Sequence, residues 1–289
     1  MRVAVTGLDG FIARYTILEL QKRGHKVVGL MRHTSNNPIL KDVDIYLADI
    51  RDSAGVYGMI EHVDGVIHLA GLLGTTENIR QAELLNETNI GGALNVLNAC
   101  DNFKTPLVNI AVGNWYENNP YSISKTTAER YCLMYAKYFG TPANVVRTLN
   151  AVGPYQKWGK VHKIVPTFIN HALRNEPINV YGGRDHCSVM DLVYAGDVAK
   201  VLCDVLLNEK TYGNIFEAGT GKGYKVWDIA QDIVRVCKSK SELIEVPMRA
   251  GESEESVVVA NKPYPIEYRD IWEVISETVD YYRGCLESS

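Results

Sequence analysis

The chain has 289 residues, of which 46% are hydrophobic and 22% are charged, and its formal net charge is −4. This length allows one large α/β domain or two smaller ones. The negative net charge, without any strongly basic run, excludes nucleic acid from the partners that we expect.

Short apolar runs alternate with longer helical patterns through the first two thirds of the chain. The short runs predict strands at residues 2–5, 26–31, 44–49, 65–70, 106–112 and 143–150. The longer patterns predict helices at residues 11–24, 89–100 and 121–139. This alternation predicts a parallel sheet with right-handed crossovers.

After about residue 150 the pattern is less regular, and prolines and glycines mark loops between short elements. This change predicts a smaller lobe that is interleaved with the first part of the chain and not separated from it by a linker. We therefore predict a first domain at residues 1–150, to which some later segments return, and a smaller lobe mainly at residues 151–289.

The cysteines and the hydropathy exclude further classes. The six cysteines lie far apart and form no CxxC pair, so we expect reduced thiols and no metal site. The first residues, MRVAVTGLDG, turn glycine-rich before an apolar segment develops, and no apolar run of about 18 residues follows. We expect a soluble, cytoplasmic protein with no membrane partner.

The stretch VAVTGLDGFIA places Gly7 and Gly10 between the first predicted strand and the first predicted helix. Glycines at this point let the backbone approach a pyrophosphate closely, and the helix N-terminus offers unpaired N–H groups and the positive end of a dipole. The turn therefore predicts a dinucleotide site.

The end of the second predicted strand bears on the choice of cofactor. An NAD-binding protein usually has an acidic residue there, which holds the ribose 2′-hydroxyl. Here Met31 is followed by Arg32, whose guanidinium suits a 2′-phosphate, so NADP is favoured over NAD; the alternative is that Arg32 is a solvated surface residue. Asp49 and Ile50 close the third predicted strand and are predicted to contact the adenine.

Ten stretches in order resemble the extended short-chain dehydrogenase/reductase family, specifically its nucleotide-sugar epimerases and dehydratases. They are TGLDGFIA, HLAG at 68–71, TNIGGALNVLNAC, YSISK, RTLNAVGPYQ, IVPTFINHAL, INVYGG, MDLVYAGDVAK, FEAGTGKG and PMRAGE. The resemblance implies an α/β fold with a Rossmann-type doubly wound parallel sheet and a smaller, interleaved C-terminal lobe that binds the nucleotide diphosphate of a sugar substrate.

The resemblance also implies the role of individual residues. Phe11 and Ile12 at the glycine turn, and Leu69 and Ala70 at the end of the fourth predicted strand, would contact the cofactor. Asn150 would face the nucleotide sugar.

Further substrate contacts are implied in the second half of the chain. The segment 160–164, with Lys163, would face the nucleotide sugar, and Arg249 would hold the diphosphate. The family often has an arginine where this chain has Met190. Arg184 could supply that charge from a loop, or it could be exposed and idle.

Tyr121 and Lys125 in YSISK would lie one turn apart on one face of a helix. A free phenol has a pKa of about 10, and lowering it to near 7 for a base role costs about 4 kcal/mol. The lysine ammonium and the charge of an oxidised nicotinamide can together stabilise the phenolate. The resemblance adds a hydrogen bond from Lys125 to the nicotinamide ribose. The alternative to a catalytic pair is that Tyr121 and Lys125 belong to an ordinary exposed amphipathic helix.

The resemblance implies a third catalytic group beside Tyr121 and Lys125, a serine or threonine in the strand before them, and this chain lacks that hydroxyl. Val112 or, by one slip, Gly113 stands where the family has serine or threonine, and neither can donate a side-chain hydrogen bond to the reacting sugar oxygen. Losing such a donor typically costs about 10² to 10³ in rate. Asn114, Thr75 or Thr76 could reach the same space and replace it.

The loop before Tyr121 also lacks the carboxylates of the family's 4,6-dehydratases. Their Asp-Glu pair corresponds here to Gly113 and Asn114, which argues against an ordinary dehydratase. Glu117 is the nearest carboxylate, and we expect it to be a solvated loop charge.

Three functions remain open. The first is NAD(P)-dependent epimerisation or atypical dehydration of a nucleotide-activated hexose through a keto-sugar, with Tyr121 as acid and base. The second is an NADPH-dependent keto-sugar reductase, which Arg32 favours. The third is a non-catalytic cofactor-binding protein, although such a protein has no physical need for the Tyr121 and Lys125 pair.

The resemblance implies a homodimer as well. Helices around residues 89–100 and 121–139 would pair across it as a four-helix bundle. Packing of the same residues against the sheet is the alternative.

Overall fold

The computed structural model describes residues 1–159, 161–208 and 212–287. Within these ranges a seven-stranded sheet has the order β11-β6-β5-β4-β1-β2-β3, and its neighbouring strands are all parallel. The strands are β1 (Arg2–Thr6), β2 (Lys26–Met31), β3 (Asp44–Leu47), β4 (Gly65–His68), β5 (Leu107–Val112), β6 (Ala143–Thr148) and β11 (Ile215–Ala218).

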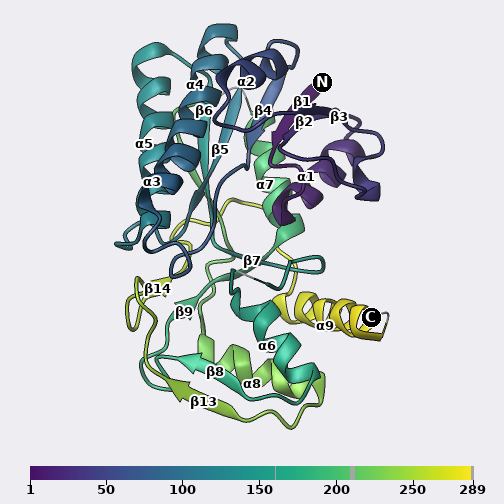
Figure 1. Ribbon diagram of the computed structural model, residues 1–289, viewed down its shortest axis with the longest axis vertical. Coiled ribbons are helices and arrows are strands. Elements are labelled where there is room, and N and C mark those ends of the chain that lie inside the picture. The colour runs from purple at the N-terminus through teal and green to yellow at the C-terminus, as the bar shows by residue number, and fades with distance from the viewer. Residues whose placement is uncertain (160, 209–211, 288–289) are drawn as a thin grey trace.

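Helices cover both faces of this sheet (Figure 1). One face packs against α1 (Phe11–Lys22) and α7 (Ala195–Leu207), and the other against α2 (Ser53–Ile60), α4 (Gly92–Phe103) and α5 (Pro120–Phe139). The prediction of a Rossmann-type doubly wound α/β fold is therefore confirmed.

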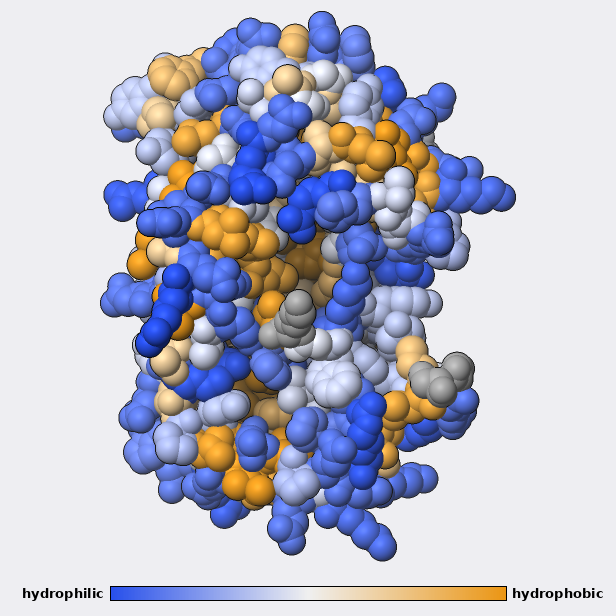
Figure 2. Space-filling view, in the orientation of Figure 1, coloured by the Kyte–Doolittle hydropathy of each residue, from blue (hydrophilic) through white to orange (hydrophobic). Residues whose placement is uncertain are grey.

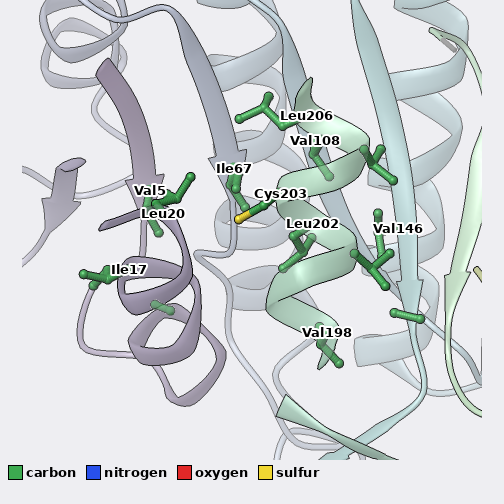
Figure 3. Close-up of a cluster of buried hydrophobic side chains, with 14 of the residues drawn as sticks. Val5, Ile17, Leu20, Ile67, Val108, Val146, Val198, Leu202, Cys203 and Leu206 are labelled. Atoms are coloured by element: carbon green, nitrogen blue, oxygen red, sulfur yellow. The ribbon is translucent and has the colours of Figure 1, made fainter. Parts of the chain in front are cut away.

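The core between the sheet, α1 and α7 shows why the strands read as apolar runs. Parallel strands covered on both faces bury the side chains of both faces. Figure 3 shows side chains of α7 and α1 packed against those of four strands. The labelled residues are Val5, Ile17, Leu20, Ile67, Val108, Val146, Val198, Leu202, Cys203 and Leu206.

The predicted helices exist, with two differences. The helix predicted at 89–100 is preceded by α3 (Ala82–Leu85) and a π-helical segment, η2 (Asn86–Gly91), and α4 begins at Gly92. The helix α2 was not predicted, because SAGVYGMI contains two glycines, which disfavour a helix by about 1 kcal/mol each.

The ends of α5 follow from its sequence. Asn119 caps the helix by accepting a hydrogen bond from the Ser122 N–H at 2.9 Å, and Pro120 occupies the first turn. Gly140 ends it at a φ of 67°, in the left-handed region that glycine tolerates. The position of Tyr121 is thus fixed at the start of a well-capped helix.

The remaining elements, apart from a 3₁₀ turn beside the main sheet, form the lower body of Figure 1 around a third core. Its helices are α6 (Ile164–Leu173), α8 (Val226–Cys237) and α9 (Ile271–Glu287). Its strands pair as β8 (Ile178–Tyr181) with β13 (Leu243–Val246), β7 (Asn150–Val152) with β10 (Leu192–Tyr194), and β9 (Val189–Met190) with β12 (Tyr224–Lys225) and β14 (Val257–Val258). A 3₁₀ turn, η1 (Pro38–Leu40), follows β2.

Later segments do return to the main sheet, since α7 and β11 follow β7 to β10 in the chain. The division near residue 150 stays a prediction. Figure 2 shows the molecule hollowed at mid-height, between the sheet and the lower body. Within the described ranges, no helix is long and apolar enough to cross a membrane.

Candidate active site

The glycine turn lies between β1 and α1 and has no room for side chains. Gly7 has a φ of +73°, and a Cβ there would lie 3.0 Å from the Ala70 Cα atom. A Cβ at Gly10 would lie 2.9 Å from the Gly7 carbonyl oxygen. Gly10 is also the N-cap of α1 and provides no side-chain cap, so the first N–H groups at Phe11 and Ile12 can meet a pyrophosphate. The turn therefore fits a dinucleotide.

A buried threonine connects this turn to the end of β4. Thr6 Oγ1 accepts hydrogen bonds from the N–H groups of Leu69 and Ala70, both at 3.0 Å, and lies 2.8 Å from His68 Nδ1. Burial lowers the pKa of His68 to about 3, so the ring is neutral and its Nδ1 atom can accept a hydrogen bond from the threonine hydroxyl. The backbone of the two predicted cofactor contacts is thereby held beside the glycine turn.

The predicted adenine end contains an arginine that the sequence did not indicate. Arg51 donates from Nε to Asp49 Oδ1 and from Nη2 to Oδ2, both at 3.0 Å. These bonds, with a smaller contribution from Arg32, lower the pKa of Asp49. Arg32 itself is exposed, and Ile50 is buried. Arg32 is thus near the predicted adenine contact and accessible, although its role toward the cofactor stays a prediction.

Tyr121 and Lys125 lie in the first turns of α5. Lys125 is 5% exposed, and burial lowers its pKa to about 8. Tyr121 is half-buried, and burial raises the pKa of its phenol to about 12. In the protein alone the phenol therefore holds its proton. The base role therefore needs a positive charge in addition to that of Lys125, such as the one that an oxidised nicotinamide would supply.

A buried amide holds this pair in place. Asn89, in the π-helical segment, is 2% exposed and donates to Ser124 Oγ at 3.0 Å and to the Leu72 carbonyl oxygen at 3.1 Å. Ser124 Oγ in turn donates to the Tyr121 carbonyl oxygen at 2.9 Å. Asn89 was not among the predicted site residues, although Gly91 and Gly92, which follow it in TNIGG, were an available signal.

Beneath the pair, α5 is joined to β6 by a buried ion pair. Arg147 donates to the two carboxylate oxygens of Glu129 at 2.8 and 2.6 Å, and their side chains are 17% and 4% exposed. The guanidinium also lies over the Trp115 ring, 4.9 Å from its centroid. This bidentate contact fixes α5 against the sheet.

The structure confirms that the end of β5 carries no hydroxyl. Val112 is buried as the last residue of the strand. A Cβ at Gly113 would lie 2.6 Å from Leu149 Cδ1, so a serine there would displace that side chain. Asn114 is half-buried, and none of the described residues bonds to its side chain.

The expectation for Glu117 is wrong. This residue is only 7% exposed and accepts a hydrogen bond from Ser253 Oγ at 2.9 Å. Asn119 makes a second contact by donating to the Gly251 carbonyl oxygen at 3.0 Å. The loop is buried because a segment near the C-terminus folds over it.

Three of the predicted substrate residues come together in what we call the substrate cluster (Thr75, Glu77, Lys163, Arg249 and Glu252). Thr75 Oγ1 donates to Glu252 Oε1 at 2.8 Å, and Arg249 Nε donates to Glu252 Oε2 at 3.1 Å. Burial lowers the pKa of Lys163, while Glu77 raises it and Arg249 lowers it further. The two glutamates were not predicted.

The other predicted substrate residues lie elsewhere. Asn150 is half-buried at the start of β7 and donates to the Asp191 carbonyl oxygen at 3.2 Å. Arg184 is exposed between β8 and β9, and no described residue pairs with its side chain. Met190 ends β9. Lys160 lies outside the described residues.

Comparison with known proteins identifies the family to which the chain belongs. The model of the NAD dependent epimerase/dehydratase family matches residues 3–219. The chain belongs to this family. The predicted family, and with it the class of enzyme, is confirmed.

Individual relatives differ in reaction. The chain is 28% identical over 273 residues to a UDP-N-acetyl-alpha-D-glucosaminuronate decarboxylase of Bacillus cytotoxicus, covering 85% of this chain and 83% of that one. It is 26% identical to a dTDP-glucose 4,6-dehydratase of Streptomyces antibioticus, covering 98% and 92%. Its fold matches a UDP-glucose 4-epimerase of Thermus thermophilus in complex with NAD, with a TM-score of 0.86, 27% identity and coverage of 98% and 99%.

Proposed function

We propose that this enzyme acts on a nucleotide-activated hexose by transient oxidation, in a reaction cycle in which hydride leaves the sugar at C4 and returns to the same molecule. The net reaction is epimerisation or an atypical dehydration. The observation that carries the proposal is the Tyr121 and Lys125 pair, held by Asn89 and Ser124 beside a glycine turn that fits a dinucleotide.

Each residue has a defined part in this cycle. A bound oxidised nicotinamide would supply the hydride acceptor and the positive charge that the phenol needs. Tyr121 takes the proton of the C4 hydroxyl and returns it when the keto group is reduced. Lys125, with a pKa of about 8, carries a proton at pH 7 and stabilises the phenolate. Arg249 and Lys163 bind the diphosphate of the nucleotide.

Arg32 and the missing dehydratase carboxylates bear on which cofactor is used and which reaction is catalysed. Arg32 is exposed, and its guanidinium suits the 2′-phosphate that NADP has and NAD lacks. A preference for NADP also supports the second candidate, a reductase that consumes NADPH. Gly113 and Asn114, at the positions of the dehydratase carboxylates, support epimerisation over ordinary dehydration. A non-catalytic, cofactor-binding protein is the remaining alternative.

The test is incubation with UDP-, GDP-, dTDP- and CDP-hexoses in D₂O, with catalytic NAD or NADP, followed by proton NMR and mass spectrometry. An epimer, a loss of water or exchange of a ring proton is the expected result. If every sugar stays intact but keto-sugars are reduced with loss of NADPH, the enzyme is the reductase. If neither assay shows turnover, the non-catalytic alternative remains.

We also propose a homodimer through α4 and α5. Packing against the sheet does not account for the apolar residues that α5 leaves exposed, since Ile123 is 51%, Tyr131 37% and Tyr138 68% exposed. Sedimentation should give a dimer for the wild type and a monomer for Ile123→Glu. A monomeric wild type at micromolar concentration would contradict the proposal.

A further inference from the structure

The carboxyl end of β6 carries a threonine beside the position that lacks its hydroxyl. Thr148 is the last residue of β6 and pairs in register with Val112, the last residue of β5. On its other side it pairs with Ala218, the last residue of β11. Ligands of open parallel sheets bind outside the carboxyl ends of the strands, which is where these residues lie.

Thr148 and Val112 point to the same face of the sheet. Val146 and Val108 belong to the core on the α7 face (Figure 3), and side chains alternate with a period of two along a strand. Thr148 and Val112 therefore share that face. Neighbouring strands lie about 4.8 Å apart, so the threonine hydroxyl is one strand spacing from the missing one.

The hydroxyl of Thr148 is buried without a partner. The residue is 9% exposed, and among the described residues nothing bonds to its Oγ1 atom. Buried hydroxyls are normally paired, because leaving one unpaired sacrifices the hydrogen bonds that it makes with water. The hydroxyl at the ligand-binding edge is thus not engaged by any other described group.

Two of the residues that the sequence suggested as replacements for the missing hydroxyl already donate hydrogen bonds to other groups. Thr75 Oγ1 donates to Glu252, and Thr76 Oγ1 donates to the Ala250 carbonyl oxygen at 3.0 Å. Both would have to break these bonds in order to reach the sugar. None of the described residues bonds to the side chain of Asn114, which is therefore the remaining competitor.

We propose that Thr148 Oγ1 donates a hydrogen bond to the sugar oxygen from which Tyr121 takes the proton, in place of the hydroxyl that Val112 lacks. The proposal rests on the proposed function. The Thr148 hydrogen stays on its oxygen throughout, while the sugar proton moves to the Tyr121 phenolate and the hydride leaves the sugar carbon. The hydrogen bond stabilises the negative charge that develops on the sugar oxygen.

The test compares Thr148→Val, which keeps the shape of the side chain, with Thr148→Ser, which keeps the hydroxyl. Thr148→Val should lower kcat by about 10² to 10³, with the KM for the nucleotide sugar and the affinity for NAD(P), measured by fluorescence, unchanged. Its Tm should stay the same or rise, because an unpaired buried polar group is removed. Thr148→Ser should retain most of the activity.

A second variant and a control distinguish catalysis from structure. Val112→Ser in the Thr148→Val background should restore part of the lost kcat. Thr278→Val, which removes a buried hydroxyl bonded to the Val274 carbonyl oxygen in α9, should lower the Tm and leave kcat unchanged.

Three results would overturn the inference while the wild type is active: near-normal kcat in Thr148→Val, a loss of NAD(P) affinity that accounts for its defect, or a fall in Tm with equal loss in Thr148→Ser. If Asn114→Ala alone abolishes kcat, the donor is Asn114. A wild type that turns over no nucleotide sugar or keto-sugar would instead refute the proposed function, and the inference with it.

Discussion

The cofactor region and the substrate cluster are held together by different forces. Around the glycine turn, Thr6 and Asn89 are buried and make neutral hydrogen bonds between neighbouring strands and helices. In the substrate cluster the contacts are charged, lie on loops, and join segments as distant as Thr75 and Glu252, which are 177 residues apart. The first region is preorganised, whereas the second can exchange its partners for a charged ligand. Four predictions test this difference between the two regions.

The largest effect is expected for the phenol of the preorganised region. Tyr121→Phe should lower kcat by about 10³, with unchanged Tm and cofactor affinity, because the ring and its surroundings remain. Tyr138→Phe on the same helix, where Tyr138 is 68% exposed, is the matched control and should behave as the wild type. A Tyr121→Phe enzyme with normal kcat would show that another group moves the proton.

Glu129→Gln should destabilise the same region most. The change leaves the Arg147 guanidinium without its carboxylate, and breaking a buried pair costs about 3 kcal/mol. Urea denaturation measures the loss. Asp280→Asn breaks the more exposed pair with Arg283 and should cost under about 1 kcal/mol. Equal costs in the two variants would mean that α5 is not fixed by this ion pair.

Lys125 should make stability depend on pH. Burial lowers its pKa from 10.5 to about 8, so the folded state disfavours the charged lysine. The free energy of unfolding should therefore rise between pH 8 and pH 10.5 by about 3 kcal/mol. Lys125→Met should be more stable than the wild type by this amount at pH 7.5, and the difference should vanish above pH 10.5. A difference in stability between the two proteins that does not change with pH would show that the pKa of Lys125 is not lowered.

In the substrate cluster the effects should appear in binding. Arg249→Leu should raise the KM for the nucleotide sugar by about 30-fold, the equivalent of one charged hydrogen bond, with little change in Tm. Arg184→Leu decides the open alternative for that residue, since an idle, exposed arginine would leave KM unchanged. A lower Tm for Arg249→Leu would mean that the ion pair with Glu252 is structural.

The elements that could be predicted from the sequence are those whose structure is determined by residues close together in the chain. The sheet, α1 and α5 followed from apolar periodicity, and the glycine turn followed from its position after β1. Lys163 and Arg249, which the resemblance assigned to the substrate, lie together with Thr75, which was predicted as a substitute hydroxyl donor. Nothing local in their segments brings them to one place, and their contact with a substrate stays a prediction.

The remaining parts depend on contacts across the fold. Glu117 was misjudged because its burial comes from Ser253, 136 residues away. Asn89 was missed because its bonds to Leu72 and Ser124 require a π-helical turn. Thr148 reads as an ordinary strand residue until the register places it beside Val112.

The internal return of the hydride can be tested by following a deuterium label at C4 of the sugar, with catalytic, unlabelled NAD or NADP. Internal return of the hydride predicts that the product keeps the deuterium while the cofactor does not accumulate in reduced form. Loss of the label from the sugar together with stoichiometric change of the cofactor would contradict the account and identify a net oxidoreductase.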